Sequence, residues 1–342
     1  MRIVLATDAW EPQVNGVART LATTVRELQR LGHEVNVAHP HLFRRVRCPF
    51  TSDVELAWSI GVADVRRLTR PPCAVHISTE GPIGLAFRRY CAARGLPFTT
   101  AYHTHFPEYL YEHTGVPVAW TARLLRWFHR PSAGIMVATP SLERTLRQRR
   151  FTAPIKLWSR GIDRGLFYPR PKTISSDKPI ALFVGRVAKE KNIEAFLLAR
   201  NAVAKFVVGD GPEKEALASK YPGVHFTGTM QGEELAQMYA NADVFVFPSR
   251  TDTFGLVVIE ALASGVPVAA YPVPGPADIL GGFPDAGCCD EILELAIDTA
   301  LRMGKRQACL DLAGRYTWEA STRQFLANLA PIPQPSLARA AS

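Results

Sequence analysis

Short apolar runs alternate along this chain with longer stretches in which apolar residues recur at helical spacing. The first run is RIVLAT at residues 2–7, and a helical pattern from Val17 to Leu31 follows it and stops at Gly32. A run of about four to eight apolar residues predicts a buried strand, and the longer repeat predicts a helix with one apolar face. Strands that alternate with helices predict a parallel sheet with helices on both faces.

The alternation forms two blocks. Strands are predicted at residues 2–7, 34–39, 73–78, 98–103, 134–139 and 155–159, and then at 180–185, 205–209, 224–228, 244–249 and 266–271. We therefore predict an α/β fold of two doubly wound domains facing a cleft, residues 1–160 and 179–315, with a Pro/Gly/Ser-rich linker at 161–178. We expect a helix at about 316–329 to pack back on the first domain and residues 331–342 to form a disordered tail.

The composition is that of a folded globular protein, with 47% hydrophobic and 21% charged residues among 342. No apolar run reaches the roughly 18 residues that a membrane span needs. The first residues, MRIVLATDAW, have too short an apolar core for a signal peptide, so we expect a cytoplasmic protein that begins with its first strand. The six cysteines lack metal-ligand spacing, which favours free thiols.

The positive charge is confined to the first part of the chain. Residues 1–150 contain twenty Arg, no Lys and eleven Asp and Glu, which leaves +9, whereas the basic and acidic residues of 151–342 balance. This asymmetry favours an anionic partner for the first domain alone: a membrane surface, a nucleic acid or an acidic substrate. The alternative is an Arg-rich composition with a solvated surface.

Two cations follow the first strand of the second block. In FVGRVAKEKNIEAF, Gly185 permits a tight turn at the strand end, and Arg186 and Lys191 come after it. Two cations at a strand end suit a diphosphate. The alternative is a pair of surface cations neutralised by Glu190 or Glu194. Gly209, after the next strand, predicts a second turn that lies near a nucleotide or is only a connector.

The stretch SRTDTFGLVVIEALASG places a lone carboxylate in an apolar helix. A helix that is apolar all round is buried, and a buried carboxylate such as Glu260 needs partners. The preceding loop carries Asp252, and its Phe254, Gly255 and Leu256 lead into a helix N-terminus that favours an anion. We interpret Glu260 as a ligand of ribose hydroxyls and Asp252 as a contact to a second sugar. A structural role for Glu260 would need a buried cation.

Polar residues also follow strands of the first block. Gly16 lies at a helix N-terminus suited to an anion, and YHTHFPEYL contains His103, His105 and Glu108. The spacing of these three residues is not that of a metal site on one helix turn. The chain has no Asp-x-Asp sequence, so we expect no metal bound to a diphosphate and no other cofactor.

Together these stretches resemble the retaining GT-B glycosyltransferases of family 4, over about residues 1–330. GRVAKEK is similar to that family's Arg-x4-Lys pair, which implies that Arg186 and Lys191 bind the donor diphosphate. DTFGLVVIE is similar to its Glu-x7-Glu motif, with Asp252 in place of the first Glu and Glu260 as the second. Asp is one methylene shorter than Glu. The motif therefore implies the sugar contact of Asp252 less directly than the ribose contact of Glu260.

Other segments extend the resemblance. NGVART is similar to the family's N-terminal glycine loop, which implies that Gly16 lies near the phosphates. YHTHFPEYL resembles an HTNFPEYL-type segment, with His105 replacing Asn, and this implies that His103 lies near the sugar and the reaction centre. SRGID is similar to the interdomain turn, with Asp163 as a structural residue.

The resemblance implies a GT-B architecture of two Rossmann-like domains, the first binding an acceptor and the second a nucleotide sugar. It implies transfer with retention. The bacterial glycolipid synthases and plant-type sulfoquinovosyl transferases are the most similar branch, which favours a UDP-sugar donor and a lipid acceptor such as diacylglycerol. Mannosyltransferases share the motifs, so a GDP-mannose- or UDP-sugar-dependent enzyme with a soluble acceptor stays open. A non-catalytic nucleotide-binding module is a further alternative, and no nucleic-acid-binding motif is present.

Two segments of the first half predict a peripheral protein at the inner face of the cell membrane. We also expect a monomer or a weak dimer. In VAWTARLLRWFHRP the residues Trp120, Leu124, Trp127 and Phe128 would form one apolar stripe with Arg123, Arg126 and Arg130 around it. HLFRRVRCPF adds a second contact through Arg44, Arg45 and Arg47 with Phe43 and Phe50. The alternative is a stripe that packs into the core.

Overall fold

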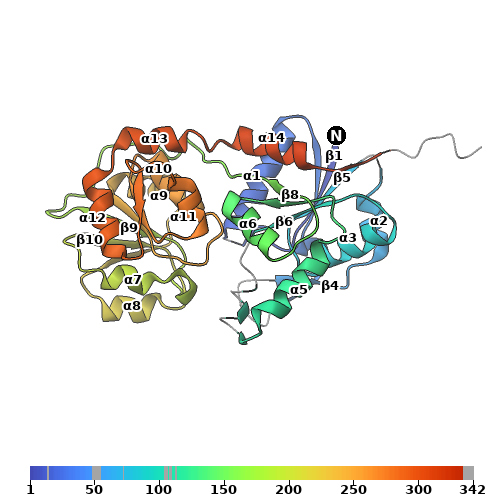
Figure 1. The fold of residues 1–342 in the computed structure, drawn as a ribbon, viewed down its shortest axis with the longest axis horizontal. Helices are drawn as coiled ribbons and strands as arrows, with labels where there is room; N and C mark the ends of the chain where they lie inside the picture. Colours follow the sequence, from blue (N-terminus) through green and yellow to red (C-terminus); the bar gives the residue numbers. More distant parts are fainter. Residues whose placement is uncertain are drawn as a thin grey trace, which may run out of the picture. The chain divides into compact units, whose positions relative to one another are not determined.

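The computed structural model describes residues 1–13, 15–47, 55–71, 73–103, 107, 110–111 and 114–333. The chain divides into two compact units, drawn with their elements in Figure 1. Unit 1 comprises Met1–Ser159 together with Trp318–Ser342, and unit 2 comprises Arg160–Thr317.

Unit 1 is built on a mainly parallel sheet with strand order β2-β1-β5-β6-β7-β8. Its parallel strands are β1 (Arg2–Ala6), β2 (Glu34–Ala38), β5 (Cys73–Ile77), β6 (Thr99–Tyr102), β7 (Gly134–Val137) and β8 (Ile155–Leu157). A last strand, β15 (Pro331–Ile332), pairs with β5 in the antiparallel sense. The prediction of disorder was therefore wrong for Pro331 and Ile332, and Ile332 is buried in the core.

Helices cover both faces of this sheet. They are α1 (Gly16–Arg30), α2 (Val62–Leu68), α3 (Pro82–Ala93), α5 (Val118–His129), α6 (Pro140–Gln148) and α14 (Trp318–Asn328). Because side chains alternate along a strand, Leu5 packs with Leu21 of α1 and Phe325 of α14, whereas Val4 packs with Phe87 of α3 on the other face. Helix α14 lies beside α1, as Figure 1 shows.

A hairpin that the apolar pattern did not predict follows β2. Strands β3 (Arg44–Arg47) and β4 (Glu55–Trp58) pair in the antiparallel sense, with Arg44 opposite Trp58 and Val46 opposite Leu56. The sequence RRVR offers a single apolar residue, so its pattern gave no signal for a strand. Ala57 of β4 is buried and belongs to the core under α3, which attaches the hairpin to unit 1.

Unit 2 is built on a parallel sheet with strand order β11-β10-β9-β12-β13-β14. Its strands are β9 (Ile180–Val184), β10 (Ala204–Val208), β11 (His225–Gly228), β12 (Val244–Phe247), β13 (Val268–Ala270) and β14 (Gly287–Cys289). Its helices are η2 (Lys189–Lys191), α7 (Ile193–Leu198), α8 (Lys214–Lys220), α9 (Gly232–Asn241), α10 (Leu256–Ala263), α11 (Pro274–Leu280), α12 (Leu293–Met303) and α13 (Arg306–Ala313). The predicted class, two doubly wound parallel α/β sheets, is confirmed.

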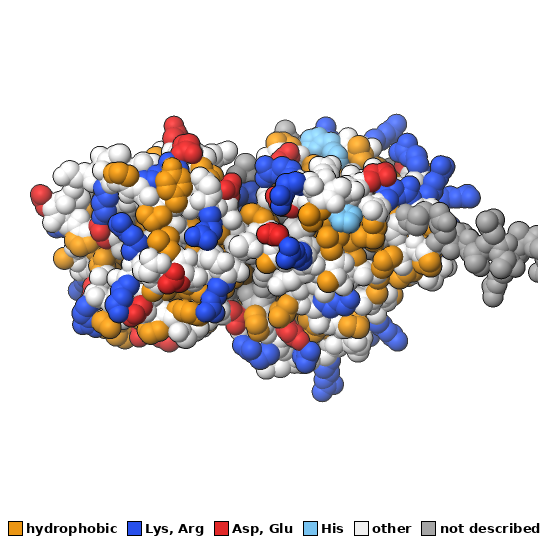
Figure 2. Space-filling model, turned by 90° about the horizontal axis from the view of Figure 1, so that it is seen from above, with side chains coloured by type: hydrophobic (Ala, Val, Ile, Leu, Met, Phe, Trp, Pro, Cys, Tyr) orange, Lys and Arg blue, Asp and Glu red, His pale blue; other side chains and the backbone are white. Residues whose placement is uncertain are grey.

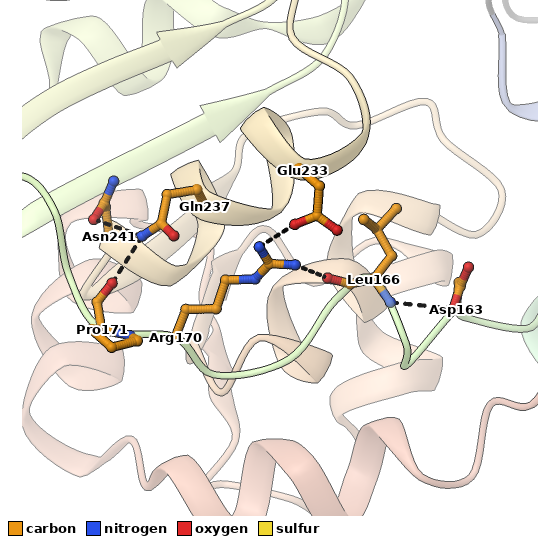
Figure 3. Close-up of polar contacts among 7 residues, drawn as sticks. All are labelled: Asp163, Leu166, Arg170, Pro171, Glu233, Gln237 and Asn241. Atoms are coloured by element: carbon orange, nitrogen blue, oxygen red, sulfur yellow. Dashed lines mark hydrogen bonds and ion pairs between the residues drawn. The ribbon is translucent and has the colours of Figure 1, made fainter.

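The segment predicted as a linker, residues 161–178, is fixed along α9 of unit 2. Figure 3 shows Arg170 donating to the Leu166 carbonyl at 2.7 Å and forming an ion pair with Glu233. The Gln237 side chain donates to the Pro171 carbonyl at 2.9 Å. Asp163 accepts a hydrogen bond from the Leu166 amide at 3.3 Å, which is the contact of a residue that shapes a turn.

Candidate functional site

The candidate donor site lies at the carboxyl ends of β9 and β12. Strand β9 pairs with β10 on one side and with β12 on the other, so the strand order reverses between β9 and β12. Parallel α/β sheets bind ligands at the carboxyl ends of the strands at such a reversal. The segment after β9 carries Arg186 and Lys191. The loop after β12 carries Asp252.

Glycines bring the strand ends of this sheet into close contact. A Cβ atom on Gly209 would lie 1.8 Å from the carbonyl oxygen of Gly185, so no side chain fits at Gly209. The Gly185 amide donates to the Val208 carbonyl at 3.0 Å, and the Gly209 amide donates to the Gly228 carbonyl at 2.8 Å. These glycines extend the pairing of β9, β10 and β11 beyond the strands and leave backbone rather than side chains at the edge.

Lys191 and Asp252 form an ion pair across this edge. The Lys191 Nζ lies 2.7 Å from Oδ1 and 2.8 Å from Oδ2 of Asp252, and both side chains are partly buried. Arg186 is exposed, and its guanidinium lies 4.0 Å from the Glu190 carboxylate. Glu194 binds Lys220 instead. Of the alternative in which Glu190 or Glu194 neutralises these cations, the structure shows a long contact between Arg186 and Glu190.

The loop before α10 is connected to the loop after β9. The Thr251 hydroxyl donates to the Glu190 carbonyl at 3.2 Å, and the Asn192 amide group donates to the Pro248 carbonyl at 3.1 Å. Gly255 is the N-cap of α10 and has φ +85, a left-handed conformation that favours glycine. Phe254 is buried, whereas Leu256 is only partly so. The structure thus brings together Asp252, Lys191 and the α10 N-terminus.

Glu260 is fully buried, and a phenol hydroxyl is among the groups that bind it. The Tyr239 hydroxyl of α9 donates to Oε2 of Glu260 at 2.9 Å. Tyr239 was not among the predicted site residues, and it precedes Glu260 by 21 residues. The sequence places Tyr239 only between two predicted strands, residues 224–228 and 244–249. Glu260 therefore has a partner inside the fold, and its contact to a ribose stays a prediction.

The predicted residues of unit 1 lie after β1 and β6. Gly16 is the first residue of α1, and the N-cap Asn15 accepts a hydrogen bond from the Ala18 amide at 2.9 Å. His103 follows β6, with its ring 5.7 Å from the Trp158 ring. His105 and Glu108 lie outside the described residues. Among the residues that are described, no group of three His, Cys, Asp or Glu side chains is placed to hold a metal ion.

Helix α5 turns part of its predicted stripe to the solvent. Trp120, Leu124 and Trp127 are 73%, 58% and 45% exposed. Phe128 is 3% exposed and packs in the core, so its inclusion in the stripe was wrong. The reason is helical geometry: at about 100° per residue, Phe128 lies about 80° around the helix from Trp120, toward the face that buries Leu125.

Arginines flank the exposed face of α5. Arg123 and Arg130 are exposed, whereas Arg126 is half-buried and donates to the Arg149 carbonyl at 3.2 Å. Arg88 of α3 is buried, and its guanidinium carbon lies 3.6 Å from the centre of the Trp127 ring. On the face drawn in Figure 2, basic side chains also stand close together toward the right-hand edge of unit 1.

The β3–β4 hairpin presents a second exposed apolar surface. Trp58 is 67% exposed, Val46 is also exposed, and both point to the face that carries Arg44. Arg45 lies 3.0 Å from the His41 ring nitrogen. Phe43 is partly buried against the core, and its membrane contact stays a prediction.

The side chain of Arg47 and all of Phe50 lie outside the described part of the chain. In the described part, no helix is both long and apolar enough to cross a bilayer.

Solved structures with this fold are GT-B glycosyltransferases. The chain matches sucrose-phosphate synthase from Thermosynechococcus elongatus with a TM-score of 0.76, over 96% of this chain and 98% of that one, at 19% identity. It matches Anabaena HepE in complex with UDP-glucose with a TM-score of 0.71, over 96% and 98%, at 16% identity. These matches show that the two doubly wound sheets form a GT-B fold.

Sequence comparisons identify the family within that class. The family model described as Glycosyltransferase Family 4 matches residues 14–166, and the model described as Glycosyl transferases group 1 matches residues 178–294. A GDP-mannose-dependent alpha-mannosyltransferase of Mycobacterium tuberculosis is 32% identical over 82% of this chain and 81% of its own length. The chain belongs to the group 1, family 4 glycosyltransferases, which transfer a sugar from a nucleotide-sugar donor.

Other relatives carry the names of different sugar transferases and synthases. The sulfoquinovosyl transferase SQD2 of Arabidopsis thaliana is 29% identical over 91% of this chain and 70% of its own length. The alpha-monoglucosyldiacylglycerol synthase of Streptococcus pneumoniae is 27% identical over 80% of this chain and 72% of its own length. The family resemblance drawn from the motifs is therefore confirmed.

Proposed function

We propose that this protein is a retaining hexosyltransferase that moves a sugar from a UDP-sugar to a lipid at the cytoplasmic surface of an anionic membrane, with diacylglycerol as the simplest such lipid. The observation that carries this proposal is the exposed row of Trp120, Leu124 and Trp127 on α5, flanked by Arg123 and Arg130. Such a helix face suits an interface in which aromatic rings enter the headgroup region and arginines meet phosphates. The name of the alpha-monoglucosyldiacylglycerol synthase relative supports a lipid acceptor.

The proposed donor site uses the residues at the ends of β9 and β12. Arg186 and Lys191 would bind the donor diphosphate and neutralise it as it leaves. Lys191 has three donor hydrogens, so it can hold a phosphate oxygen and Asp252 at once, and Asp252 would then also contact the donor sugar. Gly16 and His103 would face the phosphates and the sugar, as the motifs imply.

The proposed reaction retains the configuration of the donor sugar. The acceptor hydroxyl forms a bond to the anomeric carbon on the face that the diphosphate leaves, and the bond from that carbon to the phosphate oxygen breaks. The released oxygen takes the acceptor proton. No protein residue gains or loses a proton in this scheme, so Arg186 and Lys191 act only through charge.

A GDP-mannose-dependent enzyme is the second candidate, and the mycobacterial relative favours it. A screen of UDP- and GDP-sugars, each with and without vesicles that contain diacylglycerol, tests both candidates. Transfer to lipid from a UDP-sugar supports the first. Transfer from GDP-mannose alone would replace the UDP part of the proposal, and transfer only to a soluble sugar would replace its lipid part.

The proposed membrane surface predicts salt-sensitive binding to vesicles. We expect the protein to sediment with vesicles that contain anionic phospholipid and to bind neutral vesicles weakly, because each basic residue near an anionic surface contributes about 1 kcal/mol. Reversing Arg44, Arg45 and Arg47 to Glu should reduce both vesicle binding and lipid transfer, while donor hydrolysis persists.

Serine substitutions test whether vesicle binding depends on the exposed face of α5 or on any exposed apolar residue. Trp120→Ser with Leu124→Ser should release the protein from anionic vesicles. Leu198→Ser is the control, because Leu198 is an exposed apolar residue on α7 of unit 2. Wild-type protein that stays in the supernatant with anionic vesicles at low salt would contradict the membrane proposal.

Chelation tests the expectation of a metal-independent reaction. We expect activity to survive EDTA, since the proposed site neutralises the diphosphate with Arg186 and Lys191 and the chain has no Asp-x-Asp sequence. The measurement is the transfer rate before and after dialysis against EDTA. Complete loss that magnesium or manganese restores would contradict this expectation.

A further inference from the structure

Unit 1 has its own reversal of strand order, between β1 and β5. Strand β1 pairs with β2 on one side and with β5 on the other, and all three strands are parallel. The carboxyl ends of β1 and β5 are therefore the part of unit 1 where a ligand is expected. Asp8 follows β1, and Thr79 and Glu80 follow β5. None of these residues has a role in the function proposed so far.

Asp8 serves the fold. It is buried and accepts hydrogen bonds from the Ile83 amide at 3.0 Å, the Gly84 amide at 3.5 Å and the Thr79 hydroxyl at 2.7 Å. These contacts satisfy the first turn of α3 and join β1 to β5. Burial raises the pKa of Asp8, and the nearby charge of Glu80 adds to the rise, while the three hydrogen bonds oppose it.

Glu80 is held differently, with part of its carboxylate open to solvent. Its side chain is 27% exposed, and Oε1 lies 3.2 Å from Nε2 of the fully buried His129. The other ring nitrogen of His129 lies 2.9 Å from the Thr100 hydroxyl. A buried ring bonded on both sides cannot rotate freely, so it fixes one oxygen of Glu80 at the strand ends.

The ring that holds Glu80 is itself fixed by a buried arginine. His129 is the last residue of α5, and Arg88 donates to the carbonyls of Phe128 at 2.9 Å and Trp127 at 2.7 Å. A cation at these last carbonyls stabilises the helix end. The position of Glu80 is thus determined by α3, α5 and β6 together, which is the rigid support that a binding residue needs.

The surroundings of Glu80 favour a neutral ligand with hydroxyl groups. No Lys or Arg of the described residues forms an ion pair with Glu80, although residues 1–150 contain twenty Arg. Two other carboxylates of similar exposure in unit 1, Glu27 at 23% and Glu143 at 22%, pair with Arg30 and Arg147. An ionised carboxylate only accepts hydrogen bonds, and alcohol hydroxyls are neutral donors that suit it.

We propose that Glu80 is an acceptor-binding residue, positioned by His129, whose carboxylate accepts a hydrogen bond from a hydroxyl of the acceptor other than the one that attacks. This inference rests on the proposed retaining transfer, in which the attacking hydroxyl gives its proton to the leaving diphosphate. It narrows the lipid acceptor to one whose head group carries several hydroxyls, such as a glycosylated or glycerol-bearing lipid. Diacylglycerol has a single hydroxyl and would not use Glu80.

Acceptor kinetics of Glu80→Gln test the inference. The acceptors are diacylglycerol, monoglucosyldiacylglycerol and soluble methyl glucoside, each with wild type, Glu80→Gln and the matched control Glu143→Gln. We expect Glu80→Gln to raise the KM for monoglucosyldiacylglycerol at least tenfold, with the KM for the donor, donor hydrolysis and the melting temperature unchanged. His129→Gln should raise the acceptor KM in the same direction, and Glu143→Gln should match wild type.

The outcomes separate this inference from the function on which it rests. An acceptor KM within twofold of wild type for Glu80→Gln overturns it, and so does transfer by the wild type to diacylglycerol alone. A fall in melting temperature without a change in acceptor KM overturns it in favour of a structural role. Transfer only to methyl glucoside, with the same loss in Glu80→Gln, supports Glu80 as an acceptor ligand while overturning the lipid proposal.

Discussion

Lys191→Ala is expected to lower turnover by about 100-fold or more, and Arg186→Ala by a similar factor. Each substitution removes a charge-assisted contact to the departing diphosphate. The structure adds a second reason for Lys191, because its removal leaves the Asp252 carboxylate without the ammonium that lies 2.7 Å away. Without this ammonium, the Asp252 carboxylate would repel the diphosphate more strongly, so the Lys191 variant should be the slower of the two.

The same helical turn supplies a control for this prediction. Lys189 is exposed and belongs to η2, as Lys191 does, yet it has no assigned role. Lys189→Ala should therefore retain wild-type kinetics. The measurement is the steady-state rate of sugar transfer, together with melting curves that should change little. Rates within threefold of wild type for both Arg186→Ala and Lys191→Ala would reject the assigned role.

The fold could be predicted from the sequence because strands that are buried on both faces of a sheet appear as short apolar runs. The strands RIVLAT and IALFVG are continuous apolar runs, and the structure has β1 and β9 there. The hairpin of β3 and β4 gave no such signal, since three of the four residues of β3 are arginines. Strand β15 is too short for any period, and only its pairing with β5 makes it a strand.

The candidate site could be predicted only where a single loop carries it. Arg186 and Lys191 are close in sequence, and so are Asp252 and Gly255, so each pair was visible. The contacts that join such loops were not visible. Lys191 and Asp252 are 61 residues apart, and Glu80 and His129 are 49 apart. These pairs depend on which strands lie side by side, and a one-dimensional pattern does not contain the strand order.

The apolar pattern of α5 also could not show which of its residues are exposed and which are buried. The apolar stripe of α5 gave the right periodicity, but one stripe serves a core or a membrane surface equally well. The structure divides it, with Trp120 exposed and Phe128 buried. The division follows from where α3 lies, because Phe128 packs with Phe87 in the core of unit 1.

Glu260→Gln is the second substitution with a large expected effect. If Glu260 accepts hydrogen bonds from ribose hydroxyls, loss of its charge should weaken nucleotide binding about tenfold or more, since hydrogen bonds to a charged group contribute about 1.5–3 kcal/mol. Because the side chain is fully buried, the ribose would share the carboxylate with the Tyr239 hydroxyl after a shift of the loop before α10.

Tyr239→Phe is the matched variant that separates binding from folding. It removes the hydroxyl that donates to Glu260 at 2.9 Å and keeps the carboxylate. A ribose ligand at Glu260 predicts that Glu260→Gln loses much more nucleotide affinity than Tyr239→Phe in calorimetric titration. A purely structural pair predicts the opposite: both variants lose up to a few kcal/mol of unfolding free energy and bind nucleotide normally. Normal affinity of Glu260→Gln with a lower melting temperature would therefore assign Glu260 to the fold.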